Sequence, residues 1–402
     1  MASLMLHQIS IENFFSIAER QVVTLEVPKN APDLPCFSAS HSDGDIRLPT
    51  VIGIFGANAS GKSTVLRAIT SAFSFCIHSF DWQPNMLEPL FQPYRKKAWL
   101  KKPIIITIEF ESQLNPNSPS VKFRYEIHIL NALNALVGKR ISYESLSYAP
   151  KGKFRNLFER NNQLLKFGSD FDISDNDPRK ESVRPNASTL SSLAKLNHQI
   201  SIHLCQSIGA IQTNIIGFDR IQPHQAQLLS TYANDKKCLG NLNKELGRFD
   251  VGLEYMTVEK GEQGLFAKFK HTGLDDFIFF AEESAGTRRF IEIFLRLHYA
   301  LEQGSVAVID EIDTDLHPLL LPELLRWFSN AKRNPKGAQL LFTAHNPSLL
   351  DDLEKEQIFF TEKPCGKATQ IYSARDIKGL RREPSLMKKY LAGELGAVPQ
   401  IG

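Results

Sequence analysis

An eight-residue run, Gly56 to Ser63, constrains this chain more than any other feature, because it matches G-x-x-x-x-G-K-[ST] at every fixed position. An apolar run, Val51 to Phe55, precedes it, and a helical pattern, Thr64 to Ala72, follows it. A strand, a glycine-rich turn and a helix in that order form a phosphate-binding loop, whose backbone N–H groups and helix N-terminus surround a polyphosphate. The run therefore predicts an α/β fold of the P-loop NTPase type.

The side chains of this loop indicate which nucleotide groups they contact. Lys62 supplies a point charge for the β and γ phosphates, and the Ser63 hydroxyl can ligate Mg²⁺. We therefore expect ATP and Mg²⁺ as ligands. The predicted nucleotide contacts in the loop are Gly56, Asn58, Ala59, Ser60, Gly61, Lys62, Ser63 and Thr64.

The composition is that of a folded soluble chain, with 402 residues, 42% hydrophobic and 23% charged. No apolar stretch approaches the ~18 residues of a membrane span, and His7 and Glu12 stand where a signal peptide would be apolar. We therefore expect a cytoplasmic protein with no membrane partner. The five cysteines are scattered without a C-x-x-C pair, so zinc or redox chemistry is not expected of them.

A net charge of +3 is too small to indicate nucleic-acid binding from bulk composition. One local cluster mixes basic residues with an aromatic one and could follow a phosphate backbone, although a solvated loop is the favoured interpretation. It comprises Arg95, Lys96, Lys97, Trp99, Lys101 and Lys102.

Hydrophobic patterning predicts the arrangement of the remaining segments. Alternation in 6–14 and 22–27 predicts a strand hairpin, and further strands are expected over 104–110, 122–130, 140–147 and 155–159 in an antiparallel sheet. A polar, turn-rich segment over 167–184 suggests a boundary, and helical spacing follows in 189–209 and 226–246. We expect three units: residues 1–167 as the N-terminal lobe, 168–250 as a projecting helical insertion, and 251–402 as the C-terminal lobe. A strand pair over 253–258 and 264–270 is expected to return the chain to that lobe, although helices packed on the lobe would look similar to an insertion.

Two acids complete the predicted site. Val306 to Ile309 is an apolar run followed directly by Asp310 and Glu311, the form of a buried parallel strand that ends in carboxylates. We expect Asp310 to hold the magnesium ion and Glu311 to orient and deprotonate the attacking water, since phosphoryl transfer depends on positioning and charge neutralisation. The long separation of Ser63 from Asp310 predicts a large insertion between them.

A second apolar run, Leu340 to Ala344, ends at His345, whose imidazole could donate to the γ-phosphate. Ser284 and Gly286 precede another helical pattern, over 290–301, and so would form an anion site at a helix N-terminus. One chain cannot readily use two such sites on one nucleotide, so we expect Ser284 and Gly286 to contact ATP bound to a second protomer. Alone, this turn would equally be a helix cap.

The order of these motifs resembles the ABC-type ATPase heads of the family that includes the SMC proteins, RecF and the OLD nucleases. It is especially similar to AAA-labelled, ABC-like ATPases of bacterial phage-defence and abortive-infection operons. The resemblance rests on residues 11–14, 56–63, 249–252, 283–289, 310–318 and 343–346, and it is weakest over 168–248. It implies an ABC-ATPase-like head, with a mixed sheet, an antiparallel N-terminal sheet and a helical insertion.

By this resemblance, residues 284–287 take the signature position and 313–317 the D-loop of a head-to-head dimer. The signature reads Glu-Ser-Ala-Gly-Thr, which disfavours a transporter head, and Asn346 stands where relatives often carry aspartate. Gln92 is a candidate lid glutamine. Asp313 and Asp315 superficially offer the D-x-D pair of a Toprim nuclease, but the chain beyond His345 is shorter than the ~100 residues of a separate domain.

The resemblance therefore implies an ATPase that acts as sensor and regulatory subunit of an antiviral, toxin–antitoxin-like system. Its expected partners are further copies of the chain, a separate effector such as a Toprim-like or other nuclease, and a phage protein or DNA as trigger. The alternative is a RecF- or SMC-like DNA-repair or DNA-tethering ATPase, which a long coiled coil or a basic stripe would favour. The third hypothesis is the energy-coupling head of a membrane transporter.

Overall fold

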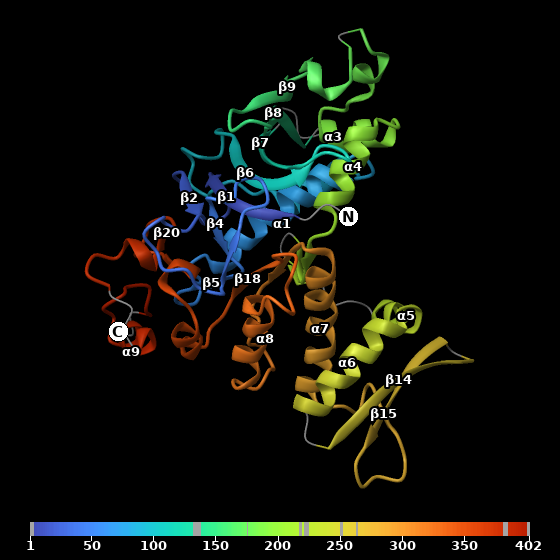
Figure 1. Ribbon diagram of the computed structural model, residues 1–402. Helices are drawn as coiled ribbons and strands as arrows, with labels where there is room; N and C mark the ends of the chain where they lie inside the picture. The colour runs from blue at the N-terminus through green and yellow to red at the C-terminus, as the bar shows by residue number, and fades with distance from the viewer. Residues whose placement is uncertain are drawn as a thin grey trace.

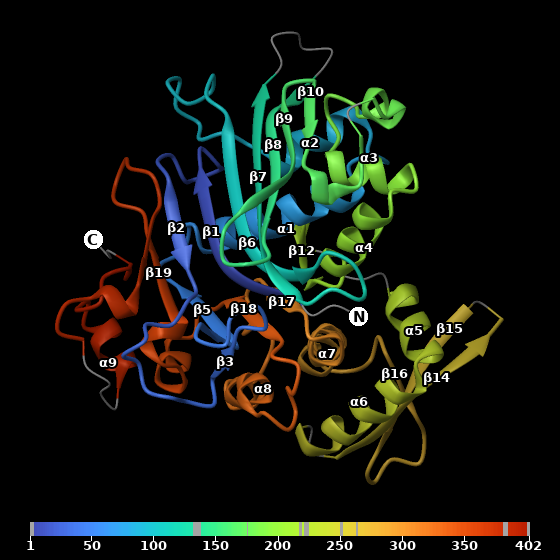
Figure 2. The ribbon, with the colours of Figure 1, turned by 45° about the horizontal axis from the view of Figure 1, so that its top comes forward.

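A computed structural model describes residues 4–131, 138–174, 176–216, 219–220, 225–249, 252–262, 264–380 and 385–399. Two large sheets are joined by helix α1 (Lys62–His78), which contacts strands of both (Figures 1 and 2). Most of the α1 side chains are buried, and one hydrophobic core extends from the antiparallel sheet across α1 to the parallel sheet. Within the described residues no helix is long and apolar enough to cross a membrane.

The parallel sheet has the strand order β11-β17-β18-β5-β19-β20. All neighbours pair in parallel except β19 and β20. Strands β5, β17 and β18 are buried at every position, which is why their sequences are apolar runs without alternation. The strands are β5 (Val51–Phe55), β11 (Gln212–Thr213), β17 (Val306–Ile309), β18 (Gln339–Thr343), β19 (Ile358–Glu362) and β20 (Gln370–Ser373).

The antiparallel sheet has the order β10-β9-β8-β7-β6-β1-β2, and it confirms the predicted N-terminal hairpin and the strands after it. Strand β7 alternates strictly between buried and half-buried residues because only one face covers the core. The strands are β1 (Met5–Glu12), β2 (Gln21–Thr24), β6 (Ile104–Gln113), β7 (Ser120–Asn131), β8 (Lys139–Ala149), β9 (Arg155–Asn161) and β10 (Leu164–Phe167).

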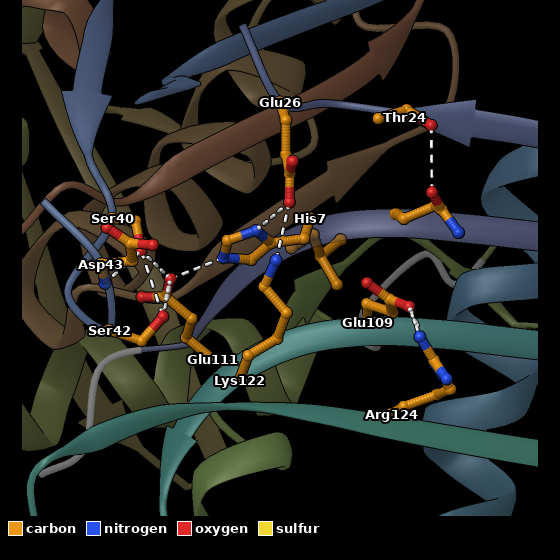
Figure 3. Close-up of polar contacts among 12 residues, drawn as sticks. His7, Thr24, Glu26, Ser40, Ser42, Asp43, Glu109, Glu111, Lys122 and Arg124 are labelled. Carbon is orange, nitrogen blue, oxygen red and sulfur yellow. Dashed lines mark hydrogen bonds and ion pairs between the residues drawn. The ribbon is translucent and has the colours of Figure 1, made fainter. Parts of the chain in front are cut away.

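A charged network connects β1, β6 and the loop of residues 40–43 (Figure 3). His7 is fully buried and lies between Glu26, 3.0 Å from Nδ1, and Glu111, 2.5 Å from Nε2. Glu111 also accepts hydrogen bonds from Ser40, from the Ser42 hydroxyl and from the His41 backbone N–H. These bonds satisfy a buried carboxylate and hold the loop of residues 40–43 against the sheet.

Residues 168–250, expected to form one projecting insertion, divide between two places. Helices α3 (Thr189–Lys195) and α4 (Gln199–Ile208) pack on α1, and α3 is held there by the buried carboxylate of Glu144 on β8. Glu144 accepts hydrogen bonds from the Ser188 hydroxyl and from the Thr189 N–H and hydroxyl, at 2.7–3.1 Å. A buried carboxylate requires such partners, and they tie this segment to the N-terminal lobe.

The projecting part is a smaller unit below the two sheets in Figure 1. It combines α5 (Gln225–Asn234) and α6 (Lys236–Phe249) with an antiparallel sheet of β14 (Leu253–Gly261), β15 (Gly264–His271) and β16 (Ile278–Phe279). The strand pair that we expected in the C-terminal lobe therefore belongs to the projection, because α5 and α6 cover one of its faces. The three-unit division at residues 168 and 251 remains a proposal. Helices α3 and α4, which that division assigns to the insertion, pack on α1 of the first lobe.

The remaining helices lie mainly beside the parallel sheet, with α7 next to both α6 and the sheet in Figures 1 and 2. They are α7 (Ala285–Gln303), α8 (Leu320–Ser329), α9 (Leu386–Leu391) and the one-turn helix α2 (Leu87–Leu90) in the predicted loop before β6. Two short strand pairs complete the description: β3 (Phe37–Ala39) with β4 (Arg47–Pro49), and β12 (Ile215–Ile216) with β13 (Asp219–Arg220).

Candidate nucleotide-binding site

The predicted phosphate-binding loop connects β5 to the N-terminus of α1. Gly56 and Gly61 have φ of 152° and 109°, a backbone conformation that side chains disfavour. A Cβ at Gly56 would lie 2.3 Å from the Thr361 carbonyl oxygen, and one at Gly61 would lie 2.5 Å from the Thr369 hydroxyl. Only glycine fits at both positions, so the loop is closely packed against the segment that contains β19 and β20.

Lys62 begins α1 and is 5% exposed. Its Nζ donates to the carbonyl oxygens of Gly56, at 2.8 Å, and Ala57, at 3.1 Å. Burial lowers the pKa of Lys62, while the nearby carboxylates of Glu311 and Asp310 oppose that shift. The ammonium group therefore lies at the loop, where a phosphate group would compensate for its desolvation.

Asp310 follows β17 and is 2% exposed. Its Oδ1 accepts hydrogen bonds from the hydroxyls of Ser63, at 2.8 Å, and Thr343, at 2.7 Å. The amide of Asn214 bonds both to the Asp310 N–H, at 2.7 Å, and to its carbonyl oxygen, at 2.9 Å. Strand order explains this meeting, because β18 lies between β5 and β17 and all three end at the same edge.

Glu311 and His345 lie together at that edge. His345 Nε2 is 3.5 Å from Glu311 Oε1. Asp313 positions the histidine loop, because its Oδ2 accepts the backbone N–H groups of His345 and Asn346, both at 2.8 Å. Glu311 itself has φ of 48°, and its N–H donates to the Thr343 hydroxyl at 2.7 Å. The backbone thus turns sharply after β17 and separates the directions of the two adjacent acids.

A cavity of about 1010 Å³ opens over these groups. Its lining contains the predicted residues Asn58, Ala59, Ser60, Gly61, Lys62, Ser63, Thr64, Glu311 and His345. Gln92, the candidate lid glutamine, also lines it, together with Tyr94, Arg95, Lys96 and Lys363. Gly56 and Asp310 lie behind this surface: Gly56 shapes the loop, and Asp310 reaches the cavity through Ser63.

Asn13 organises the outer wall of this cavity. Its side chain is buried, its Nδ2 donates to the carbonyl oxygens of Trp99, Lys102 and Pro103, and its Oδ1 accepts the Tyr94 N–H at 2.9 Å. Asn13 has φ of 54°, which asparagine tolerates better than most residues. The basic and aromatic cluster over 95–102 is therefore held beside the nucleotide cavity, and Lys96 belongs to its wall.

The predicted signature residues lie elsewhere on the chain. Ser284 caps α7, and its hydroxyl accepts the Thr287 N–H at 3.0 Å. Ser284 and Gly286 line a different cavity, of about 400 Å³, with Asp315 and His317. Neither residue lines the nucleotide cavity of its own chain.

The oxygen atoms of Ser63 and Asp310 are suited to a hard cation such as Mg²⁺, which prefers hydroxyl, carboxylate and water oxygens. Their 2.8 Å separation places both beside the cavity floor. Glu311 and His345 line the same cavity, where a carboxylate can accept a proton and an imidazole can donate one.

A family model described as "AAA domain, putative AbiEii toxin, Type IV TA system" matches residues 51–351, a range that includes the loop, Asp310, Glu311 and His345. The chain belongs to this AAA-domain family. No sequence among the curated proteins matches it.

Solved structures that are similar to this AAA-domain protein include an Smc head bound to the C-winged helix domain of ScpA. That match has 14% identity and a TM-score of 0.46, and it covers 92% of this chain and 97% of that one. Another is an Smc head with an extended coiled coil bound to the C-terminal domain of ScpA, derived from Pyrococcus furiosus. It has 13% identity and a TM-score of 0.45, with coverage of 92% and 96%.

The predicted fold class is confirmed: this is an α/β protein of the P-loop NTPase type that belongs to the AAA-domain family. Sequence reasoning missed the supporting roles of Asn214, Thr343 and Asn13. Asn214 lies next to the two-residue strand β11, which is too short for a periodic signal. Asn13 belongs to residues 11–14, which contribute to the family resemblance. No local sequence pattern predicts its hydrogen bonds to residues 94–103.

Proposed function

We propose that this AAA-domain ATPase hydrolyses Mg-ATP and uses the cycle to control a separate effector in a bacterial antiviral system. The observation that carries the ATPase part is the 2.8 Å hydrogen bond between Ser63 Oγ and Asp310 Oδ1. Glu311 and His345 line the cavity beside this pair, and their side chains lie 3.5 Å apart. That arrangement supplies a metal position, a phosphate cradle and a base in one place.

In this proposal Lys62 binds the β and γ phosphates, and Ser63 and Asp310 hold Mg²⁺ through hydroxyl and carboxylate oxygens. Bound Mg²⁺ supplies neutralisation of the phosphate charge. Glu311 accepts the proton of the attacking water, and His345 donates a hydrogen bond to the γ-phosphate. Asp313 keeps His345 in place through the two backbone bonds to its oxygen.

The position of Ser284 supports a head-to-head dimer. Ser284 and Gly286 present a helix N-terminus outside their own nucleotide cavity, so a second copy is needed to bring such a turn to the bound ATP. ATP between two heads would stabilise the dimer, and loss of the γ-phosphate would remove the bridge.

The defence role rests on the family description, which names a toxin of a type IV toxin–antitoxin system. We propose that the destructive activity belongs to a partner, such as a nuclease, and that ATP binding switches the assembly that holds it. A phage protein or DNA would act as trigger.

The decisive experiment is native mass spectrometry of the Glu311→Gln chain, co-expressed with the product of the neighbouring gene, with and without Mg-ATP. Blocked hydrolysis should trap the nucleotide-bound assembly, so we expect an ATP-dependent complex that contains the partner. Glu394→Gln, a change at an exposed residue, is the matched control and should not trap it.

A dimer without partner that binds DNA would replace the defence proposal with a DNA-tethering one. Unchanged ATP hydrolysis in Glu311→Gln would contradict the catalytic assignment.

A further inference from the structure

Three side chains with metal-binding atoms meet where the projecting unit touches α7. Asp235 precedes α6, Cys238 lies in its first turn, and His298 lies on α7. One oxygen, the sulfur and one ring nitrogen all lie within 4.8 Å of one another. Helices α6 and α7 run side by side in both views (Figures 1 and 2). None of the three residues lines the nucleotide cavity.

The ring of His298 is held in place by packing and has no protein hydrogen-bond partner among the described residues. Its side chain is only 8% exposed, and its ring stacks on Phe294 with centroids 5.6 Å apart and planes 9° apart. Within the part of the chain that the structure describes, the His298 ring makes no hydrogen bond to another residue. Because His298 also lines a cavity, its ring nitrogens are accessible to a ligand that enters there.

The ligand atoms of the other two side chains lie within 4.8 Å of the His298 ring nitrogen. Cys238 is fully buried. Asp235 Oδ1 accepts the Cys238 N–H at 2.8 Å, and its Oδ2 accepts the Tyr299 hydroxyl at 3.1 Å. A carboxylate with such bonds still has lone pairs for a metal, and the tyrosine is the kind of outer partner that orients a metal ligand.

We infer that Asp235, Cys238 and His298 form a binding site for a zinc-class transition-metal ion. Sulfur, imidazole nitrogen and carboxylate oxygen together suit zinc rather than magnesium or calcium, which take oxygen ligands. Zinc bonds of about 2.0–2.3 Å hold tetrahedral ligand atoms roughly 3.3–3.8 Å apart. The three atoms lie within 4.8 Å of one another, so metal binding would draw them closer together.

A cavity borders the cluster at His298. His298 lines a cavity of about 620 Å³ between α6, α7 and the end of α8, which could admit the ion and a water ligand. Lys332, Arg333 and Lys336 line the same cavity. Binding a divalent ion releases the Cys238 thiol proton, so the charge of the cluster rises by one, and the Asp235 carboxylate and the Cys238 thiolate together leave the bound site neutral.

The ion would clamp α6 to α7. Helix α6 belongs to the projecting unit, and α7 begins at the Ser284 cap. Metal binding would therefore fix the projection relative to the turn that carries Ser284. This inference does not depend on the proposed antiviral role or on ATP hydrolysis.

Cobalt titration of the full-length, metal-stripped chain tests the site. Co²⁺ bound by a thiolate gives a near-ultraviolet charge-transfer band together with visible d–d bands. We expect one equivalent to produce both, zinc to abolish them, and a large excess of Mg²⁺ to leave them unchanged. Mg²⁺ would compete only if cobalt occupied the oxygen ligands of the nucleotide site.

Variants identify the ligands. Cys238→Ser should abolish the charge-transfer band, and His298→Asn should weaken cobalt binding at least tenfold. Cys205→Ser is the matched control, since Cys205 is a buried cysteine outside the cluster, and it should bind as the wild type does. Retained ATP binding shows that each variant is folded.

A variant-free measurement accompanies the titration: one equivalent of zinc should raise the melting temperature of the stripped wild-type chain. The inference is overturned if the wild type gives no charge-transfer band, or if Cys238→Ser retains it.

Discussion

At the scale of single residues, the site is determined by polar atoms around Asp310. Its side chain accepts bonds from Ser63 and Thr343, and its backbone is bonded on both sides by the Asn214 amide. Such bonds contribute modestly to stability when made, but a buried group left unpaired costs more. The position of one carboxylate therefore depends on residues from the start of helix α1, the end of β18 and the residue after β11.

Asn214→Ala should disturb Asp310 without touching the nucleotide. The change removes the amide hydrogen bonds to the buried N–H and carbonyl oxygen of Asp310, at a cost of about 1–3 kcal/mol in unfolding free energy. We expect kcat for ATP to fall more than tenfold while KM changes little, measured by phosphate release. Gln212→Ala, on adjacent β11, is the control; an equal loss of kcat there would refute the specific role of Asn214.

Asn13→Gly separates the side-chain bonds of this residue from its backbone conformation, because glycine retains φ of 54°. Without the amide, the loop that carries Tyr94 and Lys96 loses the hydrogen bonds that it makes with Asn13. We expect the Kd for ATP to rise about tenfold, equivalent to about 1.4 kcal/mol, measured by calorimetry. Asn115→Gly, in the hairpin between β6 and β7, should leave affinity unchanged, and unchanged affinity in both would contradict the prediction.

At the scale of elements, long-range polar contacts decide where the segments pack. Glu144 of β8 holds α3 on the N-terminal lobe, and His7 of β1 joins β6 to the preceding loop (Figure 3). Both groups are fully buried, so each requires its partners in place. The sheet and its covering segments are thus expected to form as one cooperative unit.

The His7 network predicts a bell-shaped pH dependence of stability. Burial lowers the pKa of His7, but hydrogen bonds to Glu111 and Glu26 outweigh it and raise the pKa above 6.5. Burial raises the pKa of Glu111, but the hydrogen bonds from His7 and Ser40 outweigh it and lower that pKa to about 2. The hydrogen bond from His7 is also the main reason that the pKa of Glu26 is lowered to about 2. The carboxylate contribution is present above pH 4.5 and lost toward pH 2. The histidine contribution is present below pH 6.5 and lost as pH rises through the folded pKa.

His7→Gln should therefore lower the melting temperature most between pH 4.5 and 6.5, and the difference from wild type should shrink at higher pH. Near pH 5.5 we expect a loss of about 1–3 kcal/mol in unfolding free energy. Thermal denaturation from pH 4 to 9 measures it. His128→Gln is the control, since His128 pairs with Glu126 at a half-buried position of β7. If the difference in melting temperature between His7→Gln and wild type were the same at every pH, the predicted coupling of stability to His7 protonation would be refuted.

At the scale of the whole molecule, the signature turn and the nucleotide cavity lie on separate parts of one chain. A complete site in the proposed mechanism therefore requires two copies. The metal site inferred between α6 and α7 would act at the same scale, because it joins the projecting unit to the helix that begins with that turn.

Two changes at Ser284 distinguish a helix cap from a phosphate contact. Aspartate caps as well as serine does but repels phosphate, whereas alanine loses the cap at a cost of about 1 kcal/mol. In the Glu311→Gln background we expect Ser284→Asp to abolish ATP-dependent dimerisation with an unchanged melting temperature. Ser284→Ala should melt earlier but still dimerise in part, as measured by native mass. If Ser284→Asp dimerised with ATP more fully than Ser284→Ala, Ser284 would act only as a helix cap.

Local patterns determined much of the fold and part of the site. The glycine spacing of residues 56–63 and the apolar run before Asp310 are short-range features, because buried parallel strands and phosphate-binding turns each have their own residue requirements. The sequence therefore predicted the loop, the strands and the carboxylates at the strand end. It also predicted the antiparallel N-terminal sheet from alternation.

Tertiary structure alone decided which distant residues meet. Three contacts illustrate this: the packing of α3 and α4 on α1, the hydrogen bond between Asn214 and Asp310, and the proximity of Cys238 to His298. No sequence pattern predicts any of them. The scattered cysteines gave no reason to expect a metal, since the ligands come from two helices that are far apart in the chain. The physical reason is the same in each case: periodicity indicates which face of an element is buried, while partners across the core are chosen by packing and by the need to satisfy buried polar groups.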